Sequence, residues 1–202
     1  MRVTAILFAF AALPAALSGT QRPAADQIAD ALLPLPPPAR ADATVLGWTD
    51  DGSRVVTLRE GTNGFLCEAD RPGNDVFFVH CYPAALRPYL ERERELVAAG
   101  RGGVALDEVL GPEVRAGTLE IPVGALRSLL SGRINPETGV PDSVRLRYEV
   151  LVPFATGPQL GIGGEARRDL PYIMSAGTYE SHIMVAGEKR AWAEREGPAT
   201  TP

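Results

Sequence analysis

The stretch FLCEADRPGNDVFFVHC, residues 65–81, decides the fold of this chain because it contains two apolar strands and the turn that joins them. Residues 70–75 between the strands are rich in Asp, Pro, Gly and Asn, which are typical of turns. A hairpin closed around Asn74 places Cys67 directly opposite Cys81. We therefore expect the two cysteines to staple this hairpin.

Side-chain alternation divides this hairpin into two faces. One face carries the cysteines and further apolar side chains, and the other carries Glu68 directly opposite His80. A carboxylate can orient an imidazole for acid-base catalysis, so both residues are candidate catalytic groups. The simpler interpretation is a polar cross-strand pair on the sheet surface.

Apolar runs elsewhere predict more strands and several helices. The strands are expected at 43–48, 54–59, 117–121, 143–152, 171–174 and 182–186. Helices are expected at 83–99 and 123–130, with a further helical turn at 104–110 and a short helical segment at 25–33 that opens the proline-rich stretch. Together these elements predict an α+β fold: an antiparallel sheet of five to seven strands with two or three helices packed on one face.

The chain begins with a pattern typical of a secretory signal peptide, residues 1–18. Arg2 supplies the positive charge, residues 5–17 are apolar, and small residues follow. That apolar run is too short to span a membrane, and no later run reaches the required length. We therefore expect a periplasmic or secreted protein with a proline-rich arm at 19–42, one domain at 43–187 and a loose tail at 188–202.

Export favours a disulfide, because secreted proteins mature in an oxidising compartment. The chain contains only two cysteines, Cys67 and Cys81, and we expect them to be bonded to each other. A zinc site would need both of the chain's histidines to complete it, and no other ligand set has a recognisable spacing. We therefore expect no metal and no cofactor.

The formal net charge of −5 argues against nucleic acid as a partner, because nucleic-acid-binding proteins present basic surfaces. The same charge disfavours anionic membranes. Nineteen of the twenty basic residues are arginines, and the single exception is Lys189. A compositional bias explains this most simply, although arginine also suits carboxylate and phosphate binding.

A glycine-rich loop at 161–168 is the segment that most resembles a ligand-binding element. Consecutive glycines let backbone amides converge on an anion, and two arginines follow them. The loop lacks the spacing of a P-loop or a dinucleotide-binding motif, and a flexible connector explains it equally well. The candidate ligand-binding residues are Gly161, Gly163, Gly164, Arg167 and Arg168.

His182 is the second candidate catalytic histidine. Glu180 lies two residues before it, so both side chains share one face of a strand. Ser175 or Ser181 could be combined with His182 and Asp169 as a catalytic triad. The chain, however, has no Gly-x-Ser-x-Gly or Ser-x-x-Lys motif of serine hydrolases. A hydrolase function would therefore depend on His182, Glu180 and the loop at 161–168.

Two blocks of the sequence resemble segments of other proteins. They are Arg59-Glu60-Gly61-Thr62-Asn63-Gly64-Phe65-Leu66-Cys67 and Pro171-Tyr172-Ile173-Met174-x-x-Gly177-Thr178-x-x-x-His182 with the Ile183-Met184-Val185 that follows. The chain resembles uncharacterised exported bacterial proteins that pair a Gly-Thr-Asn-Gly-aromatic-x-Cys block with a closing Met-x-x-Gly-Thr-x-x-x-His block. The resemblance implies export but no activity, and it makes Cys67 and His182 the first candidates for mutation.

Three functions remain open after the sequence is read. The first is a non-enzymatic exported module that binds a small ligand or another envelope protein, because groups that titrate near neutral pH are few. The second is the hydrolase-type enzyme that uses His182. The third is an accessory subunit of a larger envelope assembly, which predicts an exposed apolar patch.

Overall fold

The computed structural model describes residues 22–49, 51–163 and 170–194. The helices are α1 (Ala24–Ala31), α2 (Pro37–Arg40), α3 (Arg87–Ala98), α4 (Val104–Arg115) and α5 (Gly157–Leu160), with short 3-10 turns at Ala84–Leu86 and Trp192–Glu194. The strands are β1 (Thr44–Trp48), β2 (Val55–Arg59), β3 (Phe65–Glu68), β4 (Val76–Pro83), β5 (Leu126–Arg133), β6 (Ser143–Leu151), β7 (Tyr172–Met174) and β8 (His182–Ala191).

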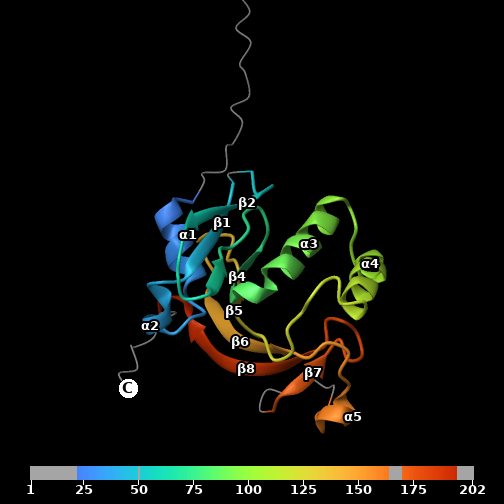
Figure 1. Ribbon diagram of the computed structural model, residues 1–202. Coiled ribbons are helices and arrows are strands. Elements are labelled where there is room, and N and C mark those ends of the chain that lie inside the picture. The colour runs from blue at the N-terminus through green and yellow to red at the C-terminus, as the bar shows by residue number, and fades with distance from the viewer. Residues whose placement is uncertain (1–21, 50, 164–169, 195–202) are drawn as a thin grey trace, which may run out of the picture.

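All eight described strands form one curved sheet in the order β2-β1-β3-β4-β5-β6-β8-β7 (Figure 1). The predicted α+β class is confirmed, but the sheet is larger than the expected five to seven strands. It is also mixed, because β1 pairs with β3 in parallel while the other pairs are antiparallel. The chain reaches this arrangement by folding β2 back along one edge of β1 before β3 takes the other edge.

The central hairpin forms in the predicted register. Cys67 lies opposite Cys81 and Glu68 lies opposite His80. Cys67 and Cys81 form a disulfide, and both are almost completely buried. The disulfide therefore fixes β3 against β4 at the centre of the sheet.

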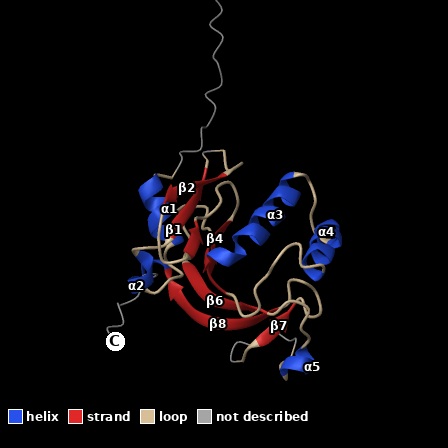
Figure 2. Ribbon diagram, viewed as in Figure 1, coloured by secondary structure: helices blue, strands red, loops and turns tan. Residues whose placement is uncertain are grey.

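Helices cover both faces of the sheet, which differs from the expected packing on one face (Figure 2). The face that carries the cysteines packs against α1 and the residues that follow it, including Leu32 and Leu35. The opposite face packs against α3 and α4 through Leu46, Leu66 and other apolar side chains. Two helical layers form because both faces of the sheet are apolar.

The segment expected to be a proline-rich arm is therefore part of the folded body over its described residues. Ala31 is fully buried in α1, and Leu33 packs against apolar side chains of β4, β5 and β6. The proline run does not form an extended spacer, because Pro37 and Pro38 start the short helix α2, where the missing N–H groups cost nothing. The sequence hides this role because only a few apolar residues precede the prolines.

Two other predictions differ from the structure. The helix expected at 123–130 is the strand β5, whose Ser128 and Leu130 face one side of the sheet while Arg127 and Leu129 face the other. A short apolar run buried on both faces does not reveal its period, and pairing with β4 and β6 decides the outcome. The short strand expected at 117–121 does not form, and β8 continues into the expected tail as far as Ala191.

Candidate binding site

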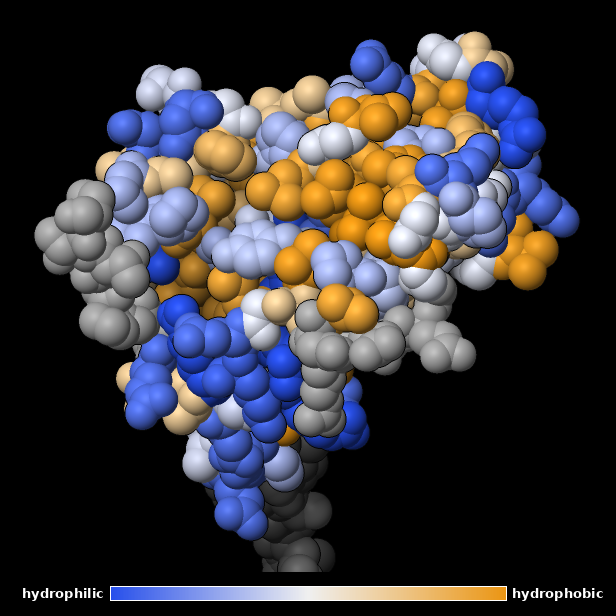
Figure 3. All heavy atoms as spheres, turned by 90° about the horizontal axis from the view of Figure 1, so that it is seen from below, coloured by the Kyte–Doolittle hydropathy of each residue, from blue (hydrophilic) through white to orange (hydrophobic). Residues whose placement is uncertain are grey.

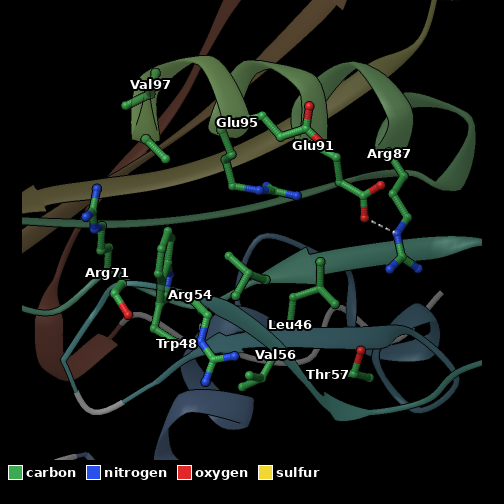
Figure 4. A pocket seen from close by; sticks show the side chains of 14 residues that line it. Leu46, Trp48, Arg54, Val56, Thr57, Arg71, Arg87, Glu91, Glu95 and Val97 are labelled. Carbon is green, nitrogen blue, oxygen red and sulfur yellow. Dashed lines mark hydrogen bonds and ion pairs between the residues drawn. The ribbon is translucent and has the colours of Figure 1, made fainter. Parts of the chain in front are cut away.

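A cleft lies between α3 and the strands β1 and β2, with a volume of about 520 Å³ (Figure 4). We call it the α3 cleft and define it by six of the side chains that line it: Leu46, Trp48, Val55, Arg71, Arg87 and Arg94. The sheet forms its floor because alternation turns Leu46, Trp48, Val55 and Thr57 toward α3. The helix supplies its roof through one stripe of side chains.

Trp48 gives the floor of the cleft a fixed aromatic wall. Its indole N–H donates a hydrogen bond to the carbonyl oxygen of Ala69 at 3.0 Å. The guanidinium of Arg71 lies over the indole ring, 5.0 Å from its centre, and its Nε donates to the carbonyl oxygen of Gly52. Figure 4 shows the ring between Arg71 on one side and Leu46 on the other. Such stacking holds a guanidinium in place while leaving its outer N–H groups for an anion.

Arginines outnumber glutamates among the residues that line the α3 cleft, although the whole protein carries a formal net charge of −5. Four arginines and two glutamates line it. Arg87 pairs with Glu91 at 2.7 Å, and Arg94 pairs with Glu68 at 2.8 Å. In the described part of the chain, no carboxylate pairs with Arg71.

A second cavity of about 440 Å³ adjoins the α3 cleft and shares Trp48, Arg71 and Arg94 with it. We call it the hairpin cavity because it lies along the turn side of β3 and β4. Burial raises the pKa of Asp70 to about 6, although the N–H of Phe78 donates a hydrogen bond to the Asp70 carboxylate. Burial also raises the pKa of Glu93 on α3.

The predicted pair Glu68–His80 forms the floor of the hairpin cavity, and both residues are buried. Arg127 lies with its Nη2 3.0 Å from Nδ1 of His80. Because arginine only donates, Nδ1 accepts and the ring proton of neutral His80 resides on Nε2. That nitrogen faces the Glu68 carboxylate at 3.5 Å.

Both ring nitrogens of His80 are therefore occupied by protein groups. Burial lowers the pKa of His80, and the Glu68 carboxylate opposes this shift only in part. Burial works against the Glu68 charge, but its hydrogen bond with His80 and the positive charge of Arg94 leave the pKa of Glu68 lowered. The pair acts as a fixed polar bridge between strands and α3, because no free ring nitrogen faces the cavity.

His182 lies on the same face of the sheet but at a distance from these cavities along the strand order. Its Nδ1 lies 2.6 Å from the backbone oxygen of Glu180, so Nδ1 carries the proton and donates. Its Nε2 lies 3.9 Å from Glu149, which also pairs with Arg127. His182 lines neither the α3 cleft nor the hairpin cavity.

Glu180 is turned away from His182 as a catalytic partner. Its carboxylate accepts a hydrogen bond from the hydroxyl of Tyr89 on α3 at 3.3 Å. Ser181 is fully buried, and its hydroxyl donates to backbone oxygens of the same loop. The described residues of the possible catalytic triad therefore make hydrogen bonds that stabilise the loop before β8.

The glycine-rich loop is only partly described. Gly161 ends α5 with a φ of 67°, a conformation that suits glycine at a helix end. Gly163 is exposed, and its carbonyl oxygen accepts a hydrogen bond from the N–H of Ile173 in β7. Gly164, Arg167 and Arg168 lie outside the described residues.

A third cavity of about 600 Å³ lies between α4 and the loops that precede β7 and β8. Phe154 lines it with a φ of 64°, which is unusual for a residue other than glycine. The Arg115 guanidinium covers the Phe154 ring at 4.6 Å, and the hydroxyl of Tyr179 donates to Asp107 at 3.1 Å. Nothing in the sequence reading singled out this cavity.

The outer face of β5, β6 and β8 is an apolar surface that no described helix covers (Figure 3). We call it the outer apolar face and define it by Leu126, Tyr148, Val150, Ile183 and Val185, which neighbour one another in the strand register. Leu126 is 43% exposed and the other four are half-buried.

The described residues contain no group of three or more His, Cys, Asp and Glu side chains that is arranged to hold a metal ion. None of the described helices is long and apolar enough to cross a membrane. Comparison with models of known protein families, with curated proteins and with solved structures found no match to this chain.

The sequence reading missed the α3 cleft. Aromatic residues on strands, such as Trp48, mainly pack in the core, and a run of mixed charges such as residues 91–95 is typical of a solvated helix face. In the structure Arg94 reaches the sheet, and Arg92 binds Glu113 of α4 through two hydrogen bonds. An arginine next to a turn proline, as in Arg71-Pro72, gives no local sign that its side chain will stack on a distant tryptophan.

Proposed function

We propose that this chain is an exported, non-enzymatic binding module that takes an anionic ligand in the α3 cleft. The observation that carries the proposal is the Arg71 guanidinium, which is held over the Trp48 ring in the α3 cleft and pairs with no carboxylate of the described residues. A cleft of this size suits a small ligand or a few side chains of a larger one. The apolar floor of Leu46 and Val55 adds room for a hydrophobic body beside the charged group.

The occupied histidine nitrogens support binding rather than catalysis. General acid-base chemistry needs a titrating group within reach of the substrate. His80 uses both nitrogens within the protein, and His182 lines neither of the two cavities under α3. The geometry therefore gives the hydrolase reading no support.

Export is part of the proposal and rests on two features. Residues 1–18 have the pattern of a signal peptide, and the buried Cys67–Cys81 disulfide suits an oxidising compartment such as the periplasm. Purification from the periplasm of an expressing bacterium, followed by intact-mass measurement, tests this part. A mature protein without the leader supports it, and a full-length reduced protein in the cytosol contradicts it.

The binding proposal is tested by NMR titration of the periplasmic protein with octanoate, and with octanamide as a matched neutral ligand. We expect octanoate to shift the backbone amides of β1, β2 and α3 around the cleft, and octanamide to bind at least tenfold more weakly. One charge-assisted hydrogen bond accounts for a factor of that size. Equal affinity for the two ligands, or no response to octanoate, contradicts the proposal.

Two protein variants sharpen this test. Arg71→Gln removes the stacked guanidinium and should weaken octanoate binding at least tenfold. Arg101→Gln is the matched control, because Arg101 is exposed at the end of α3 and changes the net charge by the same amount. If both variants weaken binding equally, the effect is the net charge of the protein and not the cleft.

The outer apolar face favours a second candidate function, the accessory subunit of an envelope assembly. Exposed apolar patches on secreted proteins mark interaction surfaces. Size-exclusion chromatography of the native envelope extract tests this candidate, with Leu126→Asp as the disrupting variant and Val104→Asp as an exposed control elsewhere. A larger complex that only Leu126→Asp dissociates supports it, and a monomer in all three samples contradicts it.

A further inference from the structure

We propose that the anionic ligand of the α3 cleft is an extended, acidic segment of polypeptide that adds to the sheet as a strand beside β2. This inference rests on the proposed function, since it names the ligand class of the same cleft. Three features of the described residues carry it: the open edge of β2, the reach of the cleft to that edge, and the arginines along the cleft.

The first feature is the free edge of β2, which is the end strand of the sheet. The N–H of Thr49 donates to the carbonyl oxygen of Arg54 at 2.9 Å, so this opposed pair is a hydrogen-bonded one. Hydrogen-bonded and non-bonded pairs alternate along an antiparallel ladder. The backbone N–H and C=O groups of Val56 therefore point toward β1. Those of Val55 and Thr57 point away from β1, toward the free edge of the sheet.

These outward backbone groups are available for a further strand. Within the described part of the chain, no group bonds to the N–H or the carbonyl oxygen of Val55 or Thr57 across the free edge. An open edge of this kind is the usual platform for strand addition, in which main-chain hydrogen bonds provide much of the affinity.

The second feature is that the α3 cleft extends as far as this edge. Val55 and Thr57 point toward α3, whereas Val56 points to the opposite face of the sheet, and all three line the cleft. Figure 4 shows Val56 directed away from α3. Because three consecutive residues of this end strand line the cleft, the cleft reaches the strand at its backbone as well as at its α3 face.

The third feature is the placement of positive charge along the same path. An added strand lies about 4.8 Å from β2, and every second side chain points to the α3 side. Figure 4 shows Arg71 at one end of the cleft and Arg87 at the other. An acidic side chain on the α3 side of the added strand therefore meets Arg71, with which no carboxylate of the described residues pairs, and a second one would share Arg87 with Glu91. The intervening side chains of the added strand lie beside Val56 on the other face.

The test uses the peptide acetyl-Glu-Val-Glu-Val-Glu-Val-amide and NMR of the periplasmic protein. We expect the amide N–H signals of Val55 and Thr57 to move downfield and to become protected from solvent exchange. The same peptide with Gln in place of Glu should bind at least tenfold more weakly, because it cannot pair with the arginines.

Two backbone-methylated peptides test the strand geometry without changing the side chains. One carries N-methyl groups on its Glu nitrogens and the other on its Val nitrogens. Only one of these sets of N–H groups can face β2, so one methylated peptide should bind at least tenfold more weakly than the other. Thr57→Pro on the protein removes an outward N–H and should weaken the unmodified peptide similarly, and the peptide comparison remains decisive if this variant is unfolded.

The outcomes separate the inference from the proposed function. Strand addition is refuted if octanoate binds but the two methylated peptides bind equally well or not at all. In that case the proposed anion site in the α3 cleft is still supported. Failure of both octanoate and the peptide refutes both proposals. Peptide binding that shifts signals on the outer apolar face instead of β2 also refutes strand addition at this cleft.

Discussion

Replacement of Asp70 by Asn should stabilise the protein at neutral pH, because the native structure holds this carboxylate in a place that disfavours its charge. Burial raises the pKa of Asp70 from 3.8 to about 6, and nearby Asp30 adds to the effect. A rise of two pKa units means that ionisation of this carboxyl group destabilises the folded state by about 3 kcal/mol. Solvent screening at this half-buried site reduces the expected gain to about 1–2 kcal/mol.

The pH dependence of this gain follows from linkage. The folded pKa lies above the unfolded one, so the native state binds more protons than the unfolded state between pH 3.8 and about 6. The cost of the charge is therefore fully present above pH 6 and absent below pH 3.8. Asp70→Asn should match the wild type near pH 3.5 and exceed it increasingly up to pH 6, with no further change above that.

Urea denaturation of both proteins at four pH values between 3.5 and 7.5 measures this directly. The Asn side chain keeps an oxygen that can accept the hydrogen bond from the N–H of Phe78, so the substitution mainly removes charge. Asp42→Asn is the matched control, because Asp42 is exposed and should change stability by less than about 0.5 kcal/mol. A loss of stability in Asp70→Asn at pH 7.5, or a gain that does not depend on pH, refutes the reasoning.

Three further predictions concern stability. Replacing Cys67 and Cys81 by Ala should lower the free energy of unfolding by about 3 kcal/mol, because the disulfide closes a loop with a sequence separation of 14. The Tm should fall by about 6–12 °C, and an unchanged Tm would contradict this prediction. Gly61→Ala should lower the free energy of unfolding by about 2–3 kcal/mol, because its new methyl group would collide with the backbone of Ala43 and Thr44, whereas Gly102→Ala has open space and should change it little. The contribution of His80 to the free energy of unfolding should fall as the pH drops below 6.5, because the pKa of His80 is lowered in the folded state. In urea titrations, His80→Gln should therefore lose less stability on acidification than the wild type.

The central part of the fold could be read from the sequence because its signals are local. Strict alternation on both sides of a turn placed Cys67 opposite Cys81 and Glu68 opposite His80, as the structure has them. The same holds for the helix after β4, where Pro88 lies in the first turn of α3 as proline allows.

The remaining parts depend on contacts that no local pattern reveals. The strand β5 has apolar residues at helical spacing and becomes a strand only because β4 and β6 offer it hydrogen bonds on both sides. The expected arm is folded because Ala31, Leu33 and Leu35 meet a sheet face built from residues far along the chain.

The candidate site shows the same limit. The sequence identified both histidines, and the structure shows that both ring nitrogens of His80 and the Nδ1 of His182 bind groups within the protein. It did not identify the α3 cleft, because Trp48, Arg71 and Arg94 come from three separate segments and meet only after the sheet and α3 have packed.

Anion binding in the α3 cleft can be observed at Arg71 itself, in the Nε–Hε spectrum of the arginine side chains during titration with octanoate and octanamide. We expect the signal of Arg71 to move with octanoate, together with the backbone amides that line the α3 cleft. We expect octanamide to leave these signals largely in place. Signals that move equally with both ligands, or an Arg71 signal that stays fixed while octanoate binds elsewhere, would contradict the claim that this cleft binds an anion.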